Sequence, residues 1–319
     1  MTISVVIAAF CGEEFIGEQI RSLLGQSLPP DEIIITDDSP DERMMEVVAE
    51  FLPDPRIRCF RNEKQLGVNG NFEKALSLAT GEIIFFCDQD DVWKSDKIAK
   101  MVAALEKSPE ADGVFCNSSA VNGQLVPLGF SLWQMRGFTG NMQKKFVSGR
   151  QLEVFLKRVT CSTHNIAIRR RVLEYALPFP PLDPFYIDTF LGMFIAAHGK
   201  WVVLDEELTF YRVHGSNLSS PRSGTPGTQC AAYRCSRSKK SFSRRVEIAG
   251  ELLRRLPDDL PVGKKEKIAA FARHYAVRDG YSSSFFIRAL QIAGEVMTLR
   301  YLNYSGSWKS IAADLFLFR

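Results

Sequence analysis

The chain of 319 residues lacks the glycine signatures that bind nucleotide phosphates through backbone amides. No Gly-x-Gly-x-x-Gly follows the first apolar stretch, which excludes the dinucleotide-binding fingerprint. No Gly-x-x-x-x-Gly-Lys-[Ser/Thr] occurs either, which excludes a P-loop. If the protein binds a nucleotide, acidic side chains and a metal ion are the remaining means of holding it.

Long hydrophobic runs and paired cysteines are also missing. No stretch approaches the roughly 18 uninterrupted apolar residues of a membrane span, and residues 1–6 have no basic segment of the kind that begins a signal peptide. The cysteines number seven, with no Cys-x-x-Cys, and Cys59, Cys87 and Cys116 lie in apolar runs. This pattern favours reduced, buried thiols in a cytoplasmic protein and argues against a thiolate zinc site.

Charge is unevenly divided along the chain. Residues 1–210 carry 21 Lys and Arg against 29 Asp and Glu, whereas residues 211–319 carry 19 against 8. A basic tail of this kind indicates an anionic partner, with a solvated basic face as the alternative. Its aromatics fall on helical stripes instead of among base-reading positions, so we expect peripheral contact with an anionic membrane and no nucleic acid.

The first ninety residues alternate between strand and helix patterns. Apolar runs predict strands over 3–10, 32–36, 57–60 and 83–87, and amphipathic segments predict helices over 14–24, 42–51 and 71–79. Runs that are apolar on both faces are typical of a parallel sheet covered by helices. The sequence therefore predicts an α/β fold with a doubly wound sheet.

Acidic residues follow the fourth of these strands directly. Asp88, Asp90 and Asp91 come within four positions after Cys87, and Asp37 and Asp38 end the second strand. The carboxyl ends of parallel strands meet at one edge of the sheet, where ligands of open α/β folds bind. Like charges gathered there favour a bound divalent cation. The alternative is that the acids only form a turn or cap the next helix.

The second half is less regular. We expect a strand at 113–116, an irregular loop over the site at 121–146, a strand at 163–168, a helix at 186–197 and strands at 201–204 and 208–213. Residues 219–243 predict a flexible linker or lid, and helices are expected over 246–256, 264–277 and 285–301. The last has an apolar stripe, with Arg288 and Arg300 outside it, typical of a core or homodimer seam and less often of a membrane face.

With these pieces placed, the chain resembles a family 2 glycosyltransferase of the GT-A fold, similar to bacterial rhamnosyltransferase-type enzymes of surface polysaccharide synthesis. The resemblance covers about residues 3–218, and its matching residues are Ser4–Phe10, Glu13, Glu14, Asp37–Ser39, Asn62, Leu66, Gly67, Asn71, Phe72, Cys87–Trp93, Asp188, Tyr211, Arg212, His214, Gly215 and Asn217. It implies a GT-A domain with a doubly wound mixed sheet over 1–218, with a nucleotide-binding half to about 111 and an acceptor half from 112. The linker and a helical C-terminal region over 244–319 would follow.

The resemblance also implies roles for individual residues. Asp188 would be the catalytic base of an inverting enzyme, and Asp90 with His214 would hold Mn or Mg. Residues on the donor side, for a UDP- or dTDP-sugar, would be Ala8, Phe10, Glu13, Asp37, Asp38, Asn71, Asp88, Gln89 and Arg212. Trp93 and His164 would lie on the acceptor side, although from sequence alone both fit buried packing positions. The acceptor would be a glycan or a lipid-linked glycan.

Some positions depart from the family pattern and leave donor and acceptor open. Cys11 stands where asparagine is usual, Ser39-Pro40-Asp41 replaces the commoner run, and residues 161–164 lack a glycine usual near the acceptor. Two other functions fit the same fold. A nucleotidyltransferase also uses acids at strand ends but normally has a glycine-rich basic signature, absent here. A non-catalytic sugar-nucleotide-binding module would more naturally have lost one of the key acids.

Overall fold

The computed structural model describes residues 1–182, 187–214, 240–258, 260–305 and 308–316. A mixed sheet of nine strands forms the body of the protein, in the order β3-β2-β1-β4-β8-β6-β9-β5 with β7 added beside β6. The strands are β1 Ile3–Ala9, β2 Glu32–Asp37, β3 Ile57–Arg61, β4 Ile83–Cys87, β5 Val92–Trp93, β6 Gly113–Val121, β7 Pro127–Ser131, β8 Ile166–Arg169 and β9 Trp201–Arg212.

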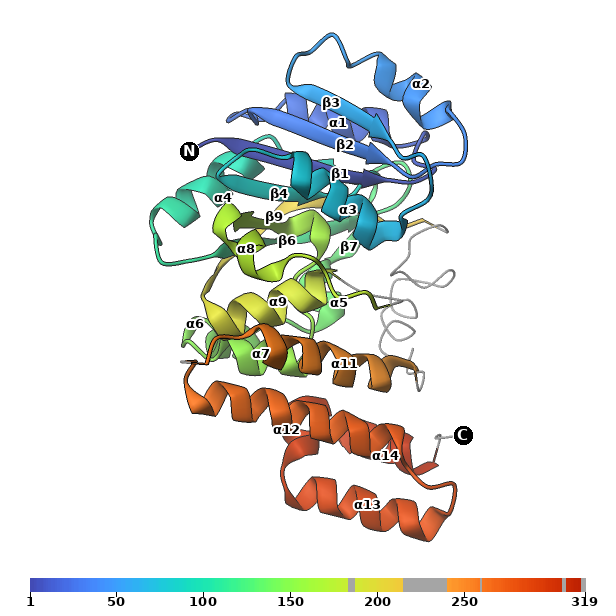
Figure 1. Cartoon of the computed structure of the whole chain (residues 1–319), viewed down its shortest axis with the longest axis vertical. Helices are drawn as coiled ribbons and strands as arrows, with labels where there is room; N and C mark the ends of the chain where they lie inside the picture. Colours follow the sequence, from blue (N-terminus) through green and yellow to red (C-terminus); the bar gives the residue numbers. More distant parts are fainter. Residues whose placement is uncertain (183–186, 215–239, 259, 306–307, 317–319) are drawn as a thin grey trace.

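The first four major strands are parallel, as the alternating pattern predicts. β1 pairs in parallel with β2 and with β4, and β2 pairs in parallel with β3. β8 runs antiparallel to both β4 and β6, which makes the whole sheet mixed. The expected α/β architecture with a mixed sheet and a C-terminal helical region is thus confirmed (Figure 1).

Helices cover both faces of this sheet because successive strand residues point to opposite sides. Val5 and Ile7 pack with α1 (Ile16–Leu24), α2 (Arg43–Ala49) and α4 (Lys97–Glu106). Val6 and Ile34 pack with α3 (Gly67–Leu78) on the other face, in a second core cluster. That cluster continues into α7 (Gln151–Lys157) and α9 (Ile187–His198), so both faces are buried.

Three local predictions in the second half are wrong. The region expected to be a loop over 121–146 contains β7, α5 (Leu132–Arg136) and most of α6 (Asn141–Val147). The strand expected from residue 163 begins only at Ile166, after the 3-10 turn η1 (Thr163–Asn165), so His164 is not in a strand. The two strands expected over 201–213 are a single strand, β9, whose register shifts near Asn117 on its partner β6.

The C-terminal region is helical, with α11 (Lys240–Arg255), α12 (Val262–Asp279), α13 (Phe285–Met297), the π-helical turn η3 (Tyr301–Ser305) and α14 (Trp308–Phe316). α11 packs on α9, and α12 packs on α11 and α7. Figure 1 shows α12, α13 and α14 at the end of the molecule opposite β3 and α2. Most of the predicted linker, residues 219–239, lies outside the described residues, and the domain boundaries stay a prediction. None of the described helices is both long and apolar enough to span a membrane.

The apolar stripe of the last long helix is mostly exposed, so of the alternatives left open it does not form a core seam. Arg288, expected outside the apolar stripe, is buried, as is Glu295, while Phe286 and Leu290 of the apolar side are exposed. The polar side faces inward because it meets buried polar partners. For example, Glu295 accepts a hydrogen bond from Arg300 and lies 2.6 Å from His274 Nδ1.

Candidate active site

The carboxyl ends of three neighbouring strands lie at one edge of the sheet. Ala9 at the end of β1 is in register with Asp37 at the end of β2, and Ile7 is in register with Cys87 at the end of β4. The residues that follow these strands therefore emerge side by side. The predicted gathering of Asp37, Asp38 and the acids after Cys87 at a single edge is confirmed by this register.

Two carboxylates at this edge are each paired with a histidine or a hydroxyl. His214 Nε2, after β9, lies 2.9 Å from Asp90 Oδ2. Thr163 Oγ1, in the turn before β8, donates to Asp88 Oδ1 at 2.9 Å. Both carboxylates are partly open to solvent. The proposed metal ligands Asp90 and His214 are thus adjacent, although they come from segments more than a hundred residues apart.

A third carboxylate, Asp91, lies underneath and is fully buried. Its Oδ1 accepts the backbone N–H of Arg212 at 2.9 Å, and its Oδ2 has no hydrogen-bond partner among the described residues. Burial, followed by the charges of Asp90 and Asp88, raises the pKa of Asp91 well above its ordinary value. An unsatisfied buried carboxylate oxygen costs free energy unless a proton or a cation compensates it.

His164 completes this group from below. Its Nδ1 lies 3.5 Å from Asp88 and 3.6 Å from Asp91, and its Nε2 lies 3.0 Å from Ser118 Oγ. Burial lowers the pKa of His164, which favours the neutral imidazole. Ligand atoms of Asp88, Asp91 and His164 all lie within 4.8 Å of one another. Oxygen and imidazole ligands at such spacing suit Mn²⁺ or Mg²⁺, so the residues present fit the cation that the fold class implies.

A buried lysine lies behind the acids. Lys97, at the start of α4, donates from Nζ to the His164 carbonyl at 2.6 Å and to Thr209 Oγ1 at 2.9 Å, and lies over the Trp93 ring. Burial lowers its pKa to about 8. Its charge offsets part of the repulsion among the carboxylates, because Lys97 opposes the upward shift of the pKa of Asp91.

Asp188 approaches the same group from the first turn of α9. Burial raises the pKa of Asp188, and the charge of Asp88 raises it further. Arg136, at the end of α5, opposes this shift, with its Nη1 3.8 Å from Asp188 Oδ2. Thr189 N–H donates to Asp188 Oδ1 at 2.6 Å. A carboxylate with a raised pKa next to the acids is suited to accept a proton.

On the nucleotide side, Phe10 and Gln89 are joined by two hydrogen bonds. Phe10 N–H donates to Gln89 Oε1 at 2.8 Å, and Gln89 Nε2 donates to the Phe10 carbonyl at 2.9 Å. The Phe10 side chain is 46% exposed, next to the half-buried Ala8. An exposed aromatic ring on a fixed backbone provides a stacking surface, so Phe10 and Gln89 remain reasonable donor contacts.

Other predicted donor contacts already have internal partners. Asp38 accepts the backbone N–H groups of Leu66 and Gly67, and Asn71 donates to the carbonyls of Ala9 and Thr36. Glu13 pairs with Arg43 at 2.7 Å. Asp37 is fully buried, and its Oδ2 has no partner among the described residues, so it retains a free acceptor. The donor roles of these four residues stay predictions.

Arg212 is almost completely buried, and its guanidinium binds protein groups. It donates to the Asp90 carbonyl at 2.8 Å, to the Gly123 carbonyl and to Glu18. Its side chain therefore fixes the loop that carries Asp90 against α1 and the β6–β7 turn. Direct contact with the donor stays a prediction for Arg212, whereas this support of Asp90 is observed.

The two residues predicted on the acceptor side are both buried. Trp93 packs against Phe85 and Lys97, and His164 stacks on Tyr211. This agrees with the packing alternative for each, and an acceptor role is untested. Sequence reasoning did not identify Lys97, Thr163 or Arg136. It did place Asp91 in the acidic run, which was the available signal for that residue.

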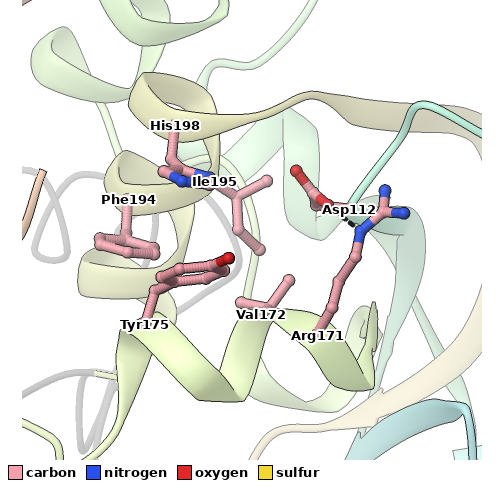
Figure 2. A pocket seen from close by; sticks show the side chains of 7 residues that line it. All are labelled: Asp112, Arg171, Val172, Tyr175, Phe194, Ile195 and His198. Atoms are coloured by element: carbon pink, nitrogen blue, oxygen red, sulfur yellow. Dashed lines mark hydrogen bonds and ion pairs between the residues drawn. The ribbon is translucent and has the colours of Figure 1, made fainter. Parts of the chain in front are cut away.

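A hollow of about 110 Å³ lies away from the acidic group. It is lined by Asp112, Arg171, Val172, Tyr175, Phe194, Ile195 and His198 (Figure 2). Arg171 pairs with Asp112 at 2.7 Å, and the His198 ring packs against those of Tyr175 and Phe194. None of these residues belongs to the acidic group, so His198 has a packing role.

A mixed sheet whose parallel strands β2 and β4 carry acids at their carboxyl ends, with a late histidine beside them, is typical of the GT-A class of nucleotide-sugar transferases. Residues 4–176 match the family described as Glycosyl transferase family 2, and the chain belongs to this family.

Relatives and solved structures agree with this assignment. The chain is 28% identical to an uncharacterized glycosyltransferase of Nostoc sp., over 68% of the chain and 66% of that protein. It is 34% identical to the Escherichia coli UDP-Glc:alpha-D-GlcNAc-diphosphoundecaprenol beta-1,3-glucosyltransferase WfaP, over 33% and 41%. The match thus spans about two thirds or less of the length of these relatives.

Two solved structures share the fold. TarS 1-349 of S. aureus in complex with UDP-GlcNAc superposes with a TM-score of 0.61 at 20% identity, over 92% of this chain and 79% of that one. The mannosyltransferase PcManGT from Pyrobaculum calidifontis, in complex with GDP-Man and Mn2+, gives 0.56 at 18% identity, over 98% and 84%.

Proposed function

We propose that the protein is an inverting glycosyltransferase that moves a hexosyl or deoxyhexosyl group from a nucleoside-diphosphate sugar to a hydroxyl of a glycan or lipid-linked acceptor. The observation that carries this is the convergence of Asp88, Asp90 and His214 with Asp188 at the carboxyl edge of the sheet. A nucleotide-binding module without catalysis has no use for a partly buried carboxylate of raised pKa at this place.

The residues divide the reaction between them. Asp188 accepts the acceptor hydroxyl proton as that oxygen attacks the anomeric carbon, and the bond from this carbon to the diphosphate oxygen breaks. Attack from the face opposite the leaving group inverts the anomeric configuration. Asp90 and His214 would hold a divalent cation, and the neighbouring group of Asp88, Asp91 and His164 offers further ligand atoms. When bound, this cation supplies Lewis-acid charge toward the departing nucleoside diphosphate.

The relatives support a narrower proposal for substrates and setting. WfaP uses UDP-Glc and a diphosphoundecaprenol acceptor by its name, and the TarS structure holds UDP-GlcNAc. We therefore propose a UDP- or dTDP-sugar donor, rhamnose included, and an acceptor of bacterial surface polysaccharide synthesis such as O-antigen or capsule. An acceptor of this kind places the enzyme at the inner face of the plasma membrane.

A thermal-shift panel of UDP-, dTDP- and GDP-sugars, each with and without Mn²⁺, tests the donor site. We expect one nucleotide class to raise the melting temperature only with metal, because binding to the folded state stabilises it by mass action. Asp90→Asn should abolish the metal-dependent shift, whereas Asp205→Asn, at an exposed acid of β9, should keep it. No response to any nucleotide, or an undiminished response in Asp90→Asn, would contradict the proposal.

The catalytic role of Asp188 is tested separately. Asp188→Asn keeps the shape of the side chain but cannot accept the proton, so transfer should fall by roughly 10²-fold or more. The nucleotide shift should remain, because Asp188 is not among the groups placed at the cation. Release of nucleoside diphosphate measures cleavage of the donor, and chromatography of the glycan product measures transfer to the acceptor. Wild-type transfer rates in Asp188→Asn would remove this residue from the mechanism.

A further inference from the structure

Helix α13 has its two sides reversed relative to an ordinary surface helix. Its only charged residues, Arg288 and Glu295, are 9% and 2% exposed, whereas Phe286, Leu290 and Met297 are 80%, 75% and 83% exposed. Large apolar side chains at such exposure are unfavourable in water. A patch of this kind marks an interaction site.

The reversal is fixed by the packing behind the helix. Glu295 lies 2.6 Å from His274 Nδ1 and pairs with Arg300, and Arg288 donates to the carbonyls of Ser282 and Leu315. These contacts hold the polar side of α13 against α12 and α14. Rotating the helix to bury its apolar side would break the buried ion pair, so the exposed orientation is the stable one.

The apolar surface extends beyond the helix itself. Phe316 of α14 is exposed and its ring lies 6.3 Å from that of Phe285, and Ile287 and Leu299 are also exposed. We name the surface formed by Phe285, Phe286, Ile287, Leu290, Val296, Met297, Leu299 and Phe316 the α13 face. It carries no exposed charge from α13, and helix α13 lies at the outer end of the molecule (Figure 1).

We propose that the α13 face inserts into the interfacial region of an anionic lipid bilayer. Charge decides between this occupant and a second copy of the chain. Residues 262–316, from α12 to α14, carry 8 Lys and Arg against 4 Asp and Glu, so two copies joined through this end would repel each other. An anionic leaflet attracts the same charge. At 13 residues, α13 is about 20 Å long, too short to cross a bilayer but suited to lie along its surface.

The proposal does not rest on glycosyl transfer, and flotation with lipid vesicles tests it independently. We expect the full chain to float with phosphatidylcholine vesicles containing phosphatidylglycerol, and more weakly with phosphatidylcholine alone or in 0.5 M NaCl. The double variant Phe286→Asp/Leu290→Asp should lower the partition coefficient by about tenfold or more.

A matched variant tests whether a loss of vesicle binding comes from the α13 face or only from the added negative charge. Leu52→Asp/Val126→Asp adds the same two negative charges at exposed apolar positions outside α13 and should keep binding within about twofold of wild type. Both variants should retain the nucleotide-dependent thermal shift, which shows that they fold. Absence of vesicle binding by the wild type, or equal loss in both variants, would overturn the proposal. So would a wild-type dimer in sedimentation that dissociates in Phe286→Asp/Leu290→Asp, because a second copy would then cover the face.

Discussion

The Asp188 carboxylate is under two opposing influences. Burial favours its neutral form, whereas the Arg136 guanidinium 3.8 Å away favours the ionised form that a base requires. Arg136 is itself nearly buried and also donates to the Cys161 carbonyl, so it is fixed in place. Arg136 is therefore a positioning residue that helps to keep Asp188 ionised, and it need not contact substrate.

Replacing this cation should change the pH dependence of catalysis. In Arg136→Met the pKa of Asp188 rises further, so the fraction of ionised base falls at low pH and the acid limb of kcat/KM moves to higher pH. We expect activity on that limb to fall by about tenfold or more, while the high-pH plateau changes little. A pH–rate profile measures this shift, and the shift should be smaller in Arg136→Lys, which keeps a positive charge near Asp188.

The alternative outcome is easy to recognise. If Arg136 served only packing, Arg136→Met would lower kcat/KM equally at all pH values. The acid limb would then lie at the same pH in Arg136→Met and Arg136→Lys. Circular dichroism and the nucleotide thermal shift provide the control for folding in both variants. A uniform loss would contradict the electrostatic role.

At the residue scale, the sequence predicts one part of the site well. Asp88, Asp90 and Asp91 follow an apolar strand directly, and strand ends in a parallel sheet share an edge, so their place could be inferred. The contacts that hold these acids in place could not be inferred from the sequence. Lys97 donates to the His164 carbonyl, and Arg212 N–H donates to Asp91, across more than sixty and a hundred residues of chain. Such contacts depend on how distant strands pack, which periodicity does not encode.

At the scale of elements, too, some features could be predicted from the sequence and others could not. Strand and helix positions in the first ninety residues follow from periodicity, because each element there has a clear apolar face. Residues 121–146 have too short and irregular a pattern to predict β7, α5 and α6. The stripe on α13 was correctly periodic, yet periodicity does not state which side meets protein. Buried polar partners decided that orientation.

A buried ion pair between α12 and α14 leads to a further prediction. The carboxylate of Asp314 in α14 accepts hydrogen bonds from Arg278 Nε at 2.7 Å, Arg278 Nη2 at 2.9 Å and the Tyr301 hydroxyl at 2.7 Å. Both Asp314 and Arg278 are almost fully buried. Asp314→Ala leaves the Arg278 charge buried without its partner, which should cost about 3–5 kcal/mol. Hydrogen exchange should then show faster exchange in α14 and η3 and unchanged protection in β1 and β4.

The control for this experiment lies on the neighbouring helix. Asp279, at the end of α12, is partly exposed and has no ion pair among the described residues. Asp279→Ala should change protection little, by the equivalent of about 0.5 kcal/mol or less. Equal effects of the two substitutions would mean that the buried ion pair does not hold α14 in place.

At the scale of the whole molecule, the sheet and the C-terminal helices share a core. One continuous apolar cluster contains Ile34 and Phe86 of the sheet, Phe190 of α9, Leu252 of α11 and Phe271 of α12. A shared core couples the folding of its parts, because exposing one part removes contacts from the next. Ligand binding at the sheet edge should therefore stabilise the described C-terminal helices that join this cluster.

A core substitution far from the acids tests this coupling. Leu252 is fully buried, so Leu252→Ala should cost about 2–5 kcal/mol and lower the melting temperature of a single transition by roughly 3–8 °C. Leu290→Ala, the same change at an exposed position, should have almost no effect. Nucleotide with Mn²⁺ should raise the single transition by a similar amount in both variants, because neither leucine lies near the site. If calorimetry instead resolved two transitions, with Leu252→Ala lowering one and nucleotide raising the other, the helical region would be an independent unit despite the continuous apolar cluster.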